Sequence, residues 1–207
     1  VTGFAAESVD DIARKSHGVP VRTLHNHYYA QYDNLGTCWM ARSEMEGPFV
    51  LLNGDTLFEA AVLRRLLTAT EEIPITVATD RKDAYDADDM KVIVSSGRLA
   101  RVGKRLDIAE VNGEAIGMSR FTATGAALFR EMLDRMVTGS DGARLWYLSA
   151  VDALALRGQF GVSWIDGLSW GEIDDRDDLE EAQAIVASWP RPEAPQSGQS
   201  LGAVSGH

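Results

Sequence analysis

The chain has little cysteine, few basic residues and no long apolar run. Cys38 is the single cysteine among 207 residues, which excludes an internal disulfide. No apolar run approaches the roughly 20 residues that a helix needs to cross a bilayer. The chain also does not begin with a basic segment followed by an apolar one, as a secretory signal would. These absences predict a globular protein in a reducing, cytoplasmic setting.

The shortage of basic residues narrows the range of partners. Lys and Arg number 20 against 31 Asp and Glu, for a formal net charge of −11. Nucleic acids and anionic membranes are bound through clustered Lys and Arg. We therefore expect neither as a partner, and the sequence does not indicate an oligomeric state.

Length and composition predict one domain followed by a tail. Residues 1–189 carry enough apolar side chains for one substantial core. The segment 190–207 is rich in Pro, Gly and Ser and is expected to be disordered. The opening residues, from Val1 to Phe4, have the pattern of a strand that is ending, so we expect the domain to be N-terminally incomplete.

Apolar spacing and turn residues predict helices and strands that alternate. Helices are expected at 6–16, 35–45 (capped by Asn34), 58–67, 124–136, 148–157 and 177–187, and strands at 19–24, 49–52, 73–79, 117–121 and 162–165. A hairpin is expected from Met90–Val94 and Leu99–Val102, joined by the turn at 95–98. The order predicts an α/β fold with a mainly parallel, doubly wound sheet and a small antiparallel hairpin on the substrate side. The run from Phe49 to Leu52 is apolar without alternation, which is typical of a strand buried on both faces.

Two short acidic motifs lie where strands are expected to end. Leu51-Leu52-Asn53-Gly54-Asp55 closes one apolar run, and Trp170-Gly171-Glu172-Ile173-Asp174 closes another. Carboxylates at the carboxyl ends of strands point into the crevice where open α/β sheets bind ligands, so the two motifs can converge on one divalent cation. The acids after the second motif have an ordinary explanation as well, because Asp175 or Asp177 is a suitable helix cap.

The order of several motifs resembles the bacterial sugar-phosphate and phosphocholine nucleotidyltransferases. The matching elements are Asn53-Gly54-Asp55, Met90-Lys91-Val92, Gly103-Lys104, Glu114-Ala115-Ile116-Gly117-Met118, and the stretch from Trp170 to Ala182. The segments 25–29 and 32–37 are similar to the "Asn-Pro-x-Tyr … Asn-Asn-x-x-Ser" pattern of the phosphocholine branch. Here His27 replaces the Pro, Asp33 the first Asn and Thr37 the Ser.

The resemblance implies a fold of the nucleotide-diphospho-sugar transferase type and a magnesium-dependent transfer. Asp55 and Asp174 match the two metal-binding aspartates of the family. Lys91 and Lys104 match positions where the family places basic residues, and we expect them to reach phosphates as mobile charges. The expected substrate-binding residues are Asn26, Asn34, Glu114, Trp170 and Glu172.

The implied substrates are an NTP, with CTP preferred, and a phosphorylated small molecule. Phosphocholine, a sugar 1-phosphate and a phosphonate remain open as acceptors. Trp146, Tyr147 and Trp170 are candidates for a cage around a quaternary ammonium group, although large aromatic residues more often pack in cores. The Gly-rich phosphate loop and first strand of the family are missing from this chain, which predicts an exposed edge on the neighbouring strand.

Two other functional classes remain open at this point. A glycosyltransferase of the GT-A type also uses an α/β sheet and a metal carboxylate, but Asp55-Thr56-Leu57 does not supply the Asp-x-Asp that such an enzyme offers. A non-catalytic remnant that binds a nucleotide or a partner is favoured by the missing loop. The presence of both acidic motifs disfavours it.

Overall fold

The computed structural model describes residues 1–15, 19–158 and 160–190. Its helices are α1 (Ala6–Lys15), α2 (Asn34–Met40), α3 (Ala60–Leu67), α4 (Ala123–Val137), α5 (Tyr147–Ala155) and α6 (Arg176–Ser188), with short 3-10 turns η1 (Arg42–Glu44) and η2 (Gly142–Arg144). Its strands are β1 (Phe49–Leu52), β2 (Thr56–Phe58), β3 (Ile75–Asp80), β4 (Lys91–Ser95), β5 (Arg98–Gly103), β6 (Gly113–Phe121), β7 (Gly161–Trp164) and β8 (Trp170–Glu172). None of the described helices is both long and apolar enough to cross a membrane.

The main sheet is built around β6. Its strands follow the order β5-β4-β6-β3-β7, and β1 also pairs with β6. Because β3 pairs with β6 along one edge, β1 and β4 share the other edge, where β1 faces residues 118–121 and β4 faces residues 113–114. The long strand β6 thus connects the hairpin to the rest of the sheet, and an isolated bridge between Leu99 and Phe160 adds a second connection.

The sheet is mixed: most of its strands point in the same direction, as predicted, but β6 runs against its neighbours. Only β3 and β7 pair in parallel among the described strands, while β6 runs antiparallel to β1, β3 and β4. The pairings nevertheless make β1, β3, β4 and β7 point in the same direction. The parallel arrangement predicted from the alternating helices is therefore interrupted by β6, whose neighbours all run opposite to it.

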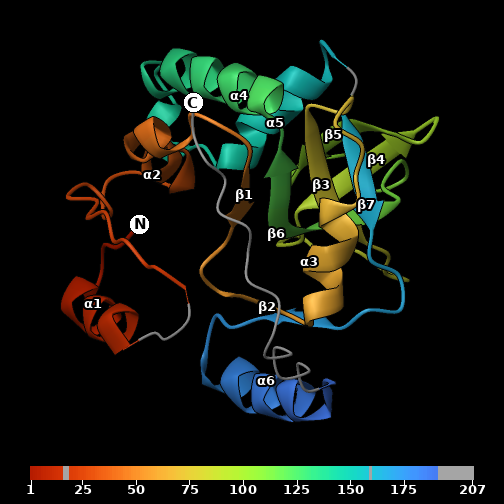
Figure 1. The fold of residues 1–207 in the computed structure, drawn as a ribbon. Coiled ribbons are helices and arrows are strands. Elements are labelled where there is room, and N and C mark those ends of the chain that lie inside the picture. The colour runs from red at the N-terminus through yellow and green to blue at the C-terminus, as the bar shows by residue number, and fades with distance from the viewer. Residues whose placement is uncertain (16–18, 159, 191–207) are drawn as a thin grey trace, which may run out of the picture.

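Helices cover both faces of this sheet, which confirms the predicted α/β class (Figure 1). On one face α2, α4 and α5 pack over residues such as Ile75, Val77 and Phe121. On the other face α3 contributes Val62 and Leu66 to a smaller cluster. Alternate residues of β3 and β6 point to opposite faces, so each strand supplies both clusters.

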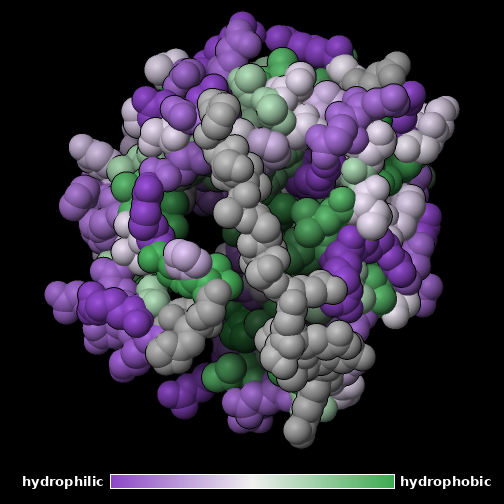
Figure 2. All heavy atoms as spheres, viewed as in Figure 1, coloured by the Kyte–Doolittle hydropathy of each residue, from purple (hydrophilic) through white to green (hydrophobic). Residues whose placement is uncertain are grey.

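The hairpin and most helices match the predictions within a few residues, but the chain before α2 does not. Residues 19–24 form no strand, and the residue that follows them, His25, forms only an isolated bridge with Thr2 among the described residues. Helix α1 buries none of its residues, and Ile12 is 70% exposed. Figure 2, drawn in the same view, shows hydrophobic residues at the surface between α1 and the sheet. The amphipathic pattern at 6–16 therefore predicted a helix correctly without revealing whether its apolar face is covered.

Strand β1 is not buried on both faces as predicted. Val50 and Leu52 are 36% and 43% exposed, whereas Phe49 and Leu51 pack against the larger core cluster. The reason is that α3 packs over β3 and β6, and it does not extend over β1. Within the described residues β1 has β6 as its single partner, so the predicted exposed edge is present.

Two further elements differ from the predictions. Residues 56–58 form β2, and the helix expected from 58 begins at Ala60. Asn34 is the first residue of α2, and Asp33 occupies the capping position. The expected disorder of 190–207 concerns residues that, from 191 onward, lie outside the described part of the chain.

Candidate active site

A small two-stranded sheet brings the two acidic motifs together. β2 and β8 pair antiparallel, with Thr56 opposite Glu172, and the backbone N–H of Ile173 donates to the carbonyl oxygen of Asp55 at 3.0 Å. Asp55 precedes β2, whereas Asp174 follows β8. Two motifs more than 100 residues apart in sequence are thereby fixed side by side at one end of the fold.

The motifs open onto a cavity of about 390 Å3 with strongly acidic walls. Its carboxylates belong to Asp55, Asp86, Asp88, Asp89, Glu114, Glu172 and Asp174, and its other polar side chains include Asn34, Asn53, Lys104, Trp146 and Tyr147. Lys104 is the only basic side chain among the described residues that line it. We call this space the acidic pocket.

The crowding of carboxylates affects the pKa of Glu172. Burial raises the pKa of Glu172, and the neighbouring charges of Asp55 and Asp174 raise it further. Like charges held this close disfavour ionisation unless a cation lies among them. The three carboxylates thus form a site whose electrostatics favour binding of a positive ion.

Asp55, Glu172 and Asp174 offer the type of donor atom that a magnesium ion takes. Carboxylate oxygens are the ligands that Mg²⁺ prefers, and it is commonly held by one or two carboxylates together with substrate phosphates. The described residues contain no cluster of three or more metal-ligating side chains arranged as a complete site. An arrangement of Asp55 and Asp174 that is completed by phosphate oxygens agrees with both observations.

A second acidic group lies around Glu114. Lys82 Nζ lies 2.6 Å from Glu114 Oε2 and 2.9 Å from Asp89 Oδ1. Burial raises the pKa of Glu114 to about 7 despite the opposing effect of Lys82. Burial would lower the pKa of Lys82, but its hydrogen bonds to Glu114 and Asp89 outweigh that effect and raise it. Glu114 is therefore held in place in the pocket wall by Lys82, and its charge depends on pH near neutrality.

The two predicted lysines have different surroundings. Lys104 Nζ lies 3.7 Å from Asp88 Oδ1 and 5.1 Å from the centroid of the Trp146 ring, and its side chain is partly exposed to the pocket. Lys91 is only 4% exposed and does not line the pocket. Its Nζ donates to the carbonyl oxygens of Asp89 and Lys104. Lys104 is placed to reach a substrate, and Lys91 is enclosed behind it.

The predicted asparagines lie at two different places. Asn34 Oδ1 accepts a hydrogen bond from the backbone N–H of Tyr147 at 2.7 Å and lines the acidic pocket. Asn26 is 1% exposed, and its side chain hydrogen-bonds to Thr37 Oγ1 and to the N–H of Tyr28. Asn26 therefore lies apart from the acidic pocket, because the turn at 27–33 separates it from the start of α2.

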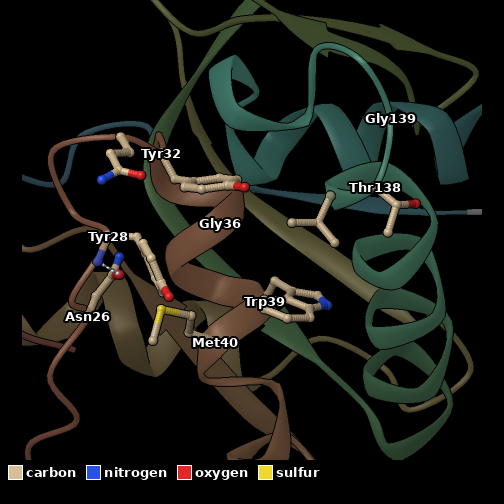
Figure 3. A pocket seen from close by; sticks show the side chains of 10 residues that line it. Asn26, Tyr28, Tyr32, Gly36, Trp39, Met40, Thr138 and Gly139 are labelled. Carbon is tan, nitrogen blue, oxygen red and sulfur yellow. Dashed lines mark hydrogen bonds between the residues drawn. The ribbon is translucent and has the colours of Figure 1, made fainter.

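Asn26 borders a second cavity, of about 690 Å3, which we call the aromatic groove (Figure 3). Its lining consists of Asn26, Tyr28, Gln31, Tyr32, Gly36, Trp39, Met40, Val137, Thr138 and Gly139. The ring of Tyr32 lies over Gly36, where an added Cβ would come within 2.6 Å of the Tyr32 Cβ. None of these lining residues carries a formal charge, which makes the groove unsuited to holding a metal and a triphosphate.

Of the predicted aromatic residues, Trp146 and Tyr147 line the acidic pocket and Trp170 does not. Trp170 Nε1 donates to Asp80 Oδ2 at 2.7 Å, and the ring packs against the smaller core cluster. The structure therefore ties Trp170 to the end of β3. Trp146 remains a candidate for contact with a substrate, whereas Tyr147 is only 2% exposed and packs in the larger core cluster.

Several pocket residues were not recognised from the sequence. Asp86, Asp88 and Asp89 belong to an acidic loop between β3 and β4, and Lys82 anchors that loop. The run of acids in this loop was the available signal, but acidic loops on a chain of this charge are common solvent-exposed features. Asn53 also lines the pocket, where Gly117 has a positive φ of 73° and comes close to its side chain.

Comparisons with known proteins agree with this geometry at the level of the fold. No protein-family model matches the chain. The inositol-1-phosphate CTP transferase from T. maritima superimposes with a TM-score of 0.74 at 19% identity, over 93% of this chain and 76% of that one. The CTP:phosphocholine cytidylyltransferase from Streptococcus pneumoniae gives a TM-score of 0.67 at 16% identity, over 87% and 74% of the two chains. The chain thus has the fold of the nucleotidyltransferases that its motifs resemble.

Proposed function

We propose that this chain carries the metal-binding and acceptor-binding parts of a magnesium-dependent nucleotidyltransferase. The observation that supports this most is the pairing of β2 with β8, which places Asp55 and Asp174 together beside Glu172. The acidic pocket also contains Lys104, a flexible positive charge that can approach phosphate oxygens.

The reaction is the joining of an NTP to a phosphorylated small molecule. An acceptor phosphate oxygen forms a bond to the α-phosphorus, the bond from that phosphorus to the bridging oxygen breaks, and pyrophosphate leaves with the electron pair. The attacking oxygen is already ionised, so the pocket needs no general base. Repulsion between the two anions dominates the barrier, and a bound magnesium ion would supply charge neutralisation and alignment.

CTP is the preferred donor in this proposal. The early segment with Asn26 and Asn34 resembles the phosphocholine branch, and two structural neighbours are named as CTP-using enzymes. Turnover of each NTP in turn tests the preference.

The walls of the acidic pocket favour an acceptor with a positively charged group. Lys104 Nζ lies between the carboxylate of Asp88 and the ring of Trp146, an arrangement that suits any ammonium ion. When Lys104 turns toward a phosphate, the space beside Asp88 and the Trp146 ring becomes available to a substrate amine. A phosphorylated amino alcohol or phosphocholine fits this better than a neutral polyol phosphate.

The test is pyrophosphate release by the purified chain with magnesium, each NTP, and either phosphocholine or inositol 1-phosphate. We expect CTP to bind, and in any turnover that is measured we expect a higher kcat/KM for phosphocholine than for inositol 1-phosphate. No turnover with any pair, together with no calorimetric signal for nucleotide, would favour a non-catalytic remnant. Nucleotide binding without turnover would instead indicate that a further part of the site is needed.

A further inference from the structure

Lys91 has surroundings that differ from those of a phosphate-binding lysine. It is the first residue of β4, lies between Gly103 of β5 and Glu114 of β6, and is 4% exposed. An ammonium group at that depth cannot meet a substrate in the acidic pocket without a large rearrangement. We therefore infer the role of Lys91 from the groups to which its ammonium donates hydrogen bonds.

The Lys91 ammonium group joins two backbone carbonyls. Nζ lies 3.1 Å from the carbonyl oxygen of Lys104 and 3.3 Å from that of Asp89. The carbonyl of Asp89 also accepts from the backbone N–H of Lys91 at 3.0 Å. Within the described part of the chain, no carboxylate forms an ion pair with Lys91.

Burying the Lys91 ammonium group costs free energy of folding. A buried ammonium loses its hydration, and here only neutral carbonyl dipoles compensate for it. A methionine side chain has a similar length and would fill the same space without desolvating a charge. A methionine could not donate hydrogen bonds to two carbonyl oxygens at once, as an ammonium with three donors can.

The two carbonyls belong to segments that both border the acidic pocket. Asp89 ends the acidic loop that also carries Asp86 and Asp88, and Lys104 is the basic side chain of the pocket lining. A side-chain ion pair also joins these two segments, because Lys104 Nζ lies 3.7 Å from Asp88 Oδ1. The bridge through Lys91 therefore sets how far apart the acidic loop and Lys104 can lie.

We propose that Lys91 is a positioning residue: its buried ammonium fixes the backbone of Lys104 against that of Asp89, so that Lys104 Nζ faces the pocket. The catalytic consequence rests on the proposed function, because it assumes that Lys104 acts on the phosphates. The structural consequence, a link between two pocket segments, stands independently of any reaction.

Lys82 provides a matched comparison within the same loop. Its ammonium also binds Asp89, but through the side chain, and its second partner is Glu114 on β6. Lys82 thus anchors the acidic loop to the sheet, and its ion pairs within the described residues go to Asp89 and Glu114 and not to the segment of Lys104. Replacing each lysine with methionine removes one link and leaves the other.

Hydrogen exchange of backbone amides tests the structural part. In Lys91→Met we expect exchange to accelerate about tenfold both in the acidic loop, 86–89, and around 103–105. In Lys82→Met we expect the acceleration in 86–89 alone. Unchanged protection at 103–105 in Lys91→Met would overturn the proposal. A Lys91→Gln variant, which keeps one donor group, is measured beside it in case Lys91→Met does not fold.

A double-mutant cycle tests the catalytic part. In the otherwise unchanged chain we expect Lys91→Met, or Lys91→Gln in its place, to lower kcat/KM about tenfold, and in a Lys104→Met background less than about twofold. Multiplying losses would show that Lys91 does not act through Lys104. If the chain shows neither turnover nor nucleotide binding, the proposed function fails, while the exchange experiment still decides whether Lys91 links the two segments.

Discussion

The acidic pocket and the aromatic groove lie next to the same short helix and differ in almost every property. The pocket is lined by carboxylates and one lysine, whereas the groove is lined by rings, methionine and uncharged polar groups. The sequence motif around α2 contributes to both, with Asn34 in the pocket and Asn26 beside the groove. Residues of one sequence motif, here Asn26 and Asn34, can thus belong to separate sites when a turn lies between them.

The largest expected effect concerns the carboxylates of the pocket. Asp55→Asn and Asp174→Asn should each lower kcat/KM at least about a hundredfold, because in the proposed function each carboxylate helps to hold the magnesium ion. The measurement is pyrophosphate release at saturating magnesium. Glu131→Gln, which alters an exposed ion pair with Arg135 on α4, is the control and should leave turnover unchanged. Near-normal turnover of either aspartate variant would contradict its role as a metal ligand.

The two asparagines offer a direct contrast. Asn26→Ala should lower the free energy of unfolding by about 2 kcal/mol, because it leaves Thr37 and the Tyr28 N–H without their buried partner. Turnover per folded molecule should change little. Asn34→Ala removes the hydrogen-bond acceptor of the Tyr147 N–H in the pocket wall. This variant should lose stability and should also raise KM for the acceptor substrate. Urea unfolding and steady-state kinetics separate the two effects, and equal kinetic losses would remove the distinction between the sites.

Glu114 makes the pocket sensitive to pH in a way that the groove is not. Burial raises its pKa in the folded protein from 4.5 to about 7, so the folded state binds more protons than the unfolded state between these values. The contribution of Glu114 to stability therefore falls as the pH rises from about 4.5 to about 7. Above about pH 7 this contribution no longer changes. The raised pKa of Glu172 acts in the same direction, whereas the lowered pKa of Asp89 has its effect below its usual value of 3.8.

The urea midpoint of Glu114→Gln relative to the original chain measures the contribution of this one group. We expect the variant to gain stability relative to the original chain as the pH is raised from 5 to 7.5. A difference that does not depend on pH would show that Glu114 is ionised throughout that range.

The smallest effect is expected in the groove. Trp39→Phe removes the hydrogen bond from Nε1 to Asp134 Oδ1, which should cost about 1 kcal/mol of stability at a partly exposed position. Because the groove is not part of the proposed reaction, kcat/KM should stay within about twofold. A large loss of turnover would show that the groove and the pocket work together.

The sequence predicted the hairpin, the helices and the ends of most strands because these depend on local periodicity and turn residues. Gly97, with a φ of 74°, sits in the predicted turn. Asp175, one of the two predicted caps, caps α6, and its own N–H donates in return to Asp178 Oδ2. It did not predict the antiparallel direction of β6 or the exposed face of β1. Strand direction and coverage depend on which distant strands and helices pack together, and a local apolar run carries no such information.

The composition and motifs of the chain by themselves determined an α/β domain with two acidic motifs at strand ends and a resemblance to nucleotidyltransferases. Only the tertiary structure decided that β2 and β8 join those motifs, that a further acidic loop completes the pocket, and that Lys91 is enclosed while Lys104 is available. The physical reason is that side-chain accessibility and the proximity of charges arise from packing between segments far apart in the chain. A lysine that binds phosphate and one that binds two buried carbonyls look alike in the sequence.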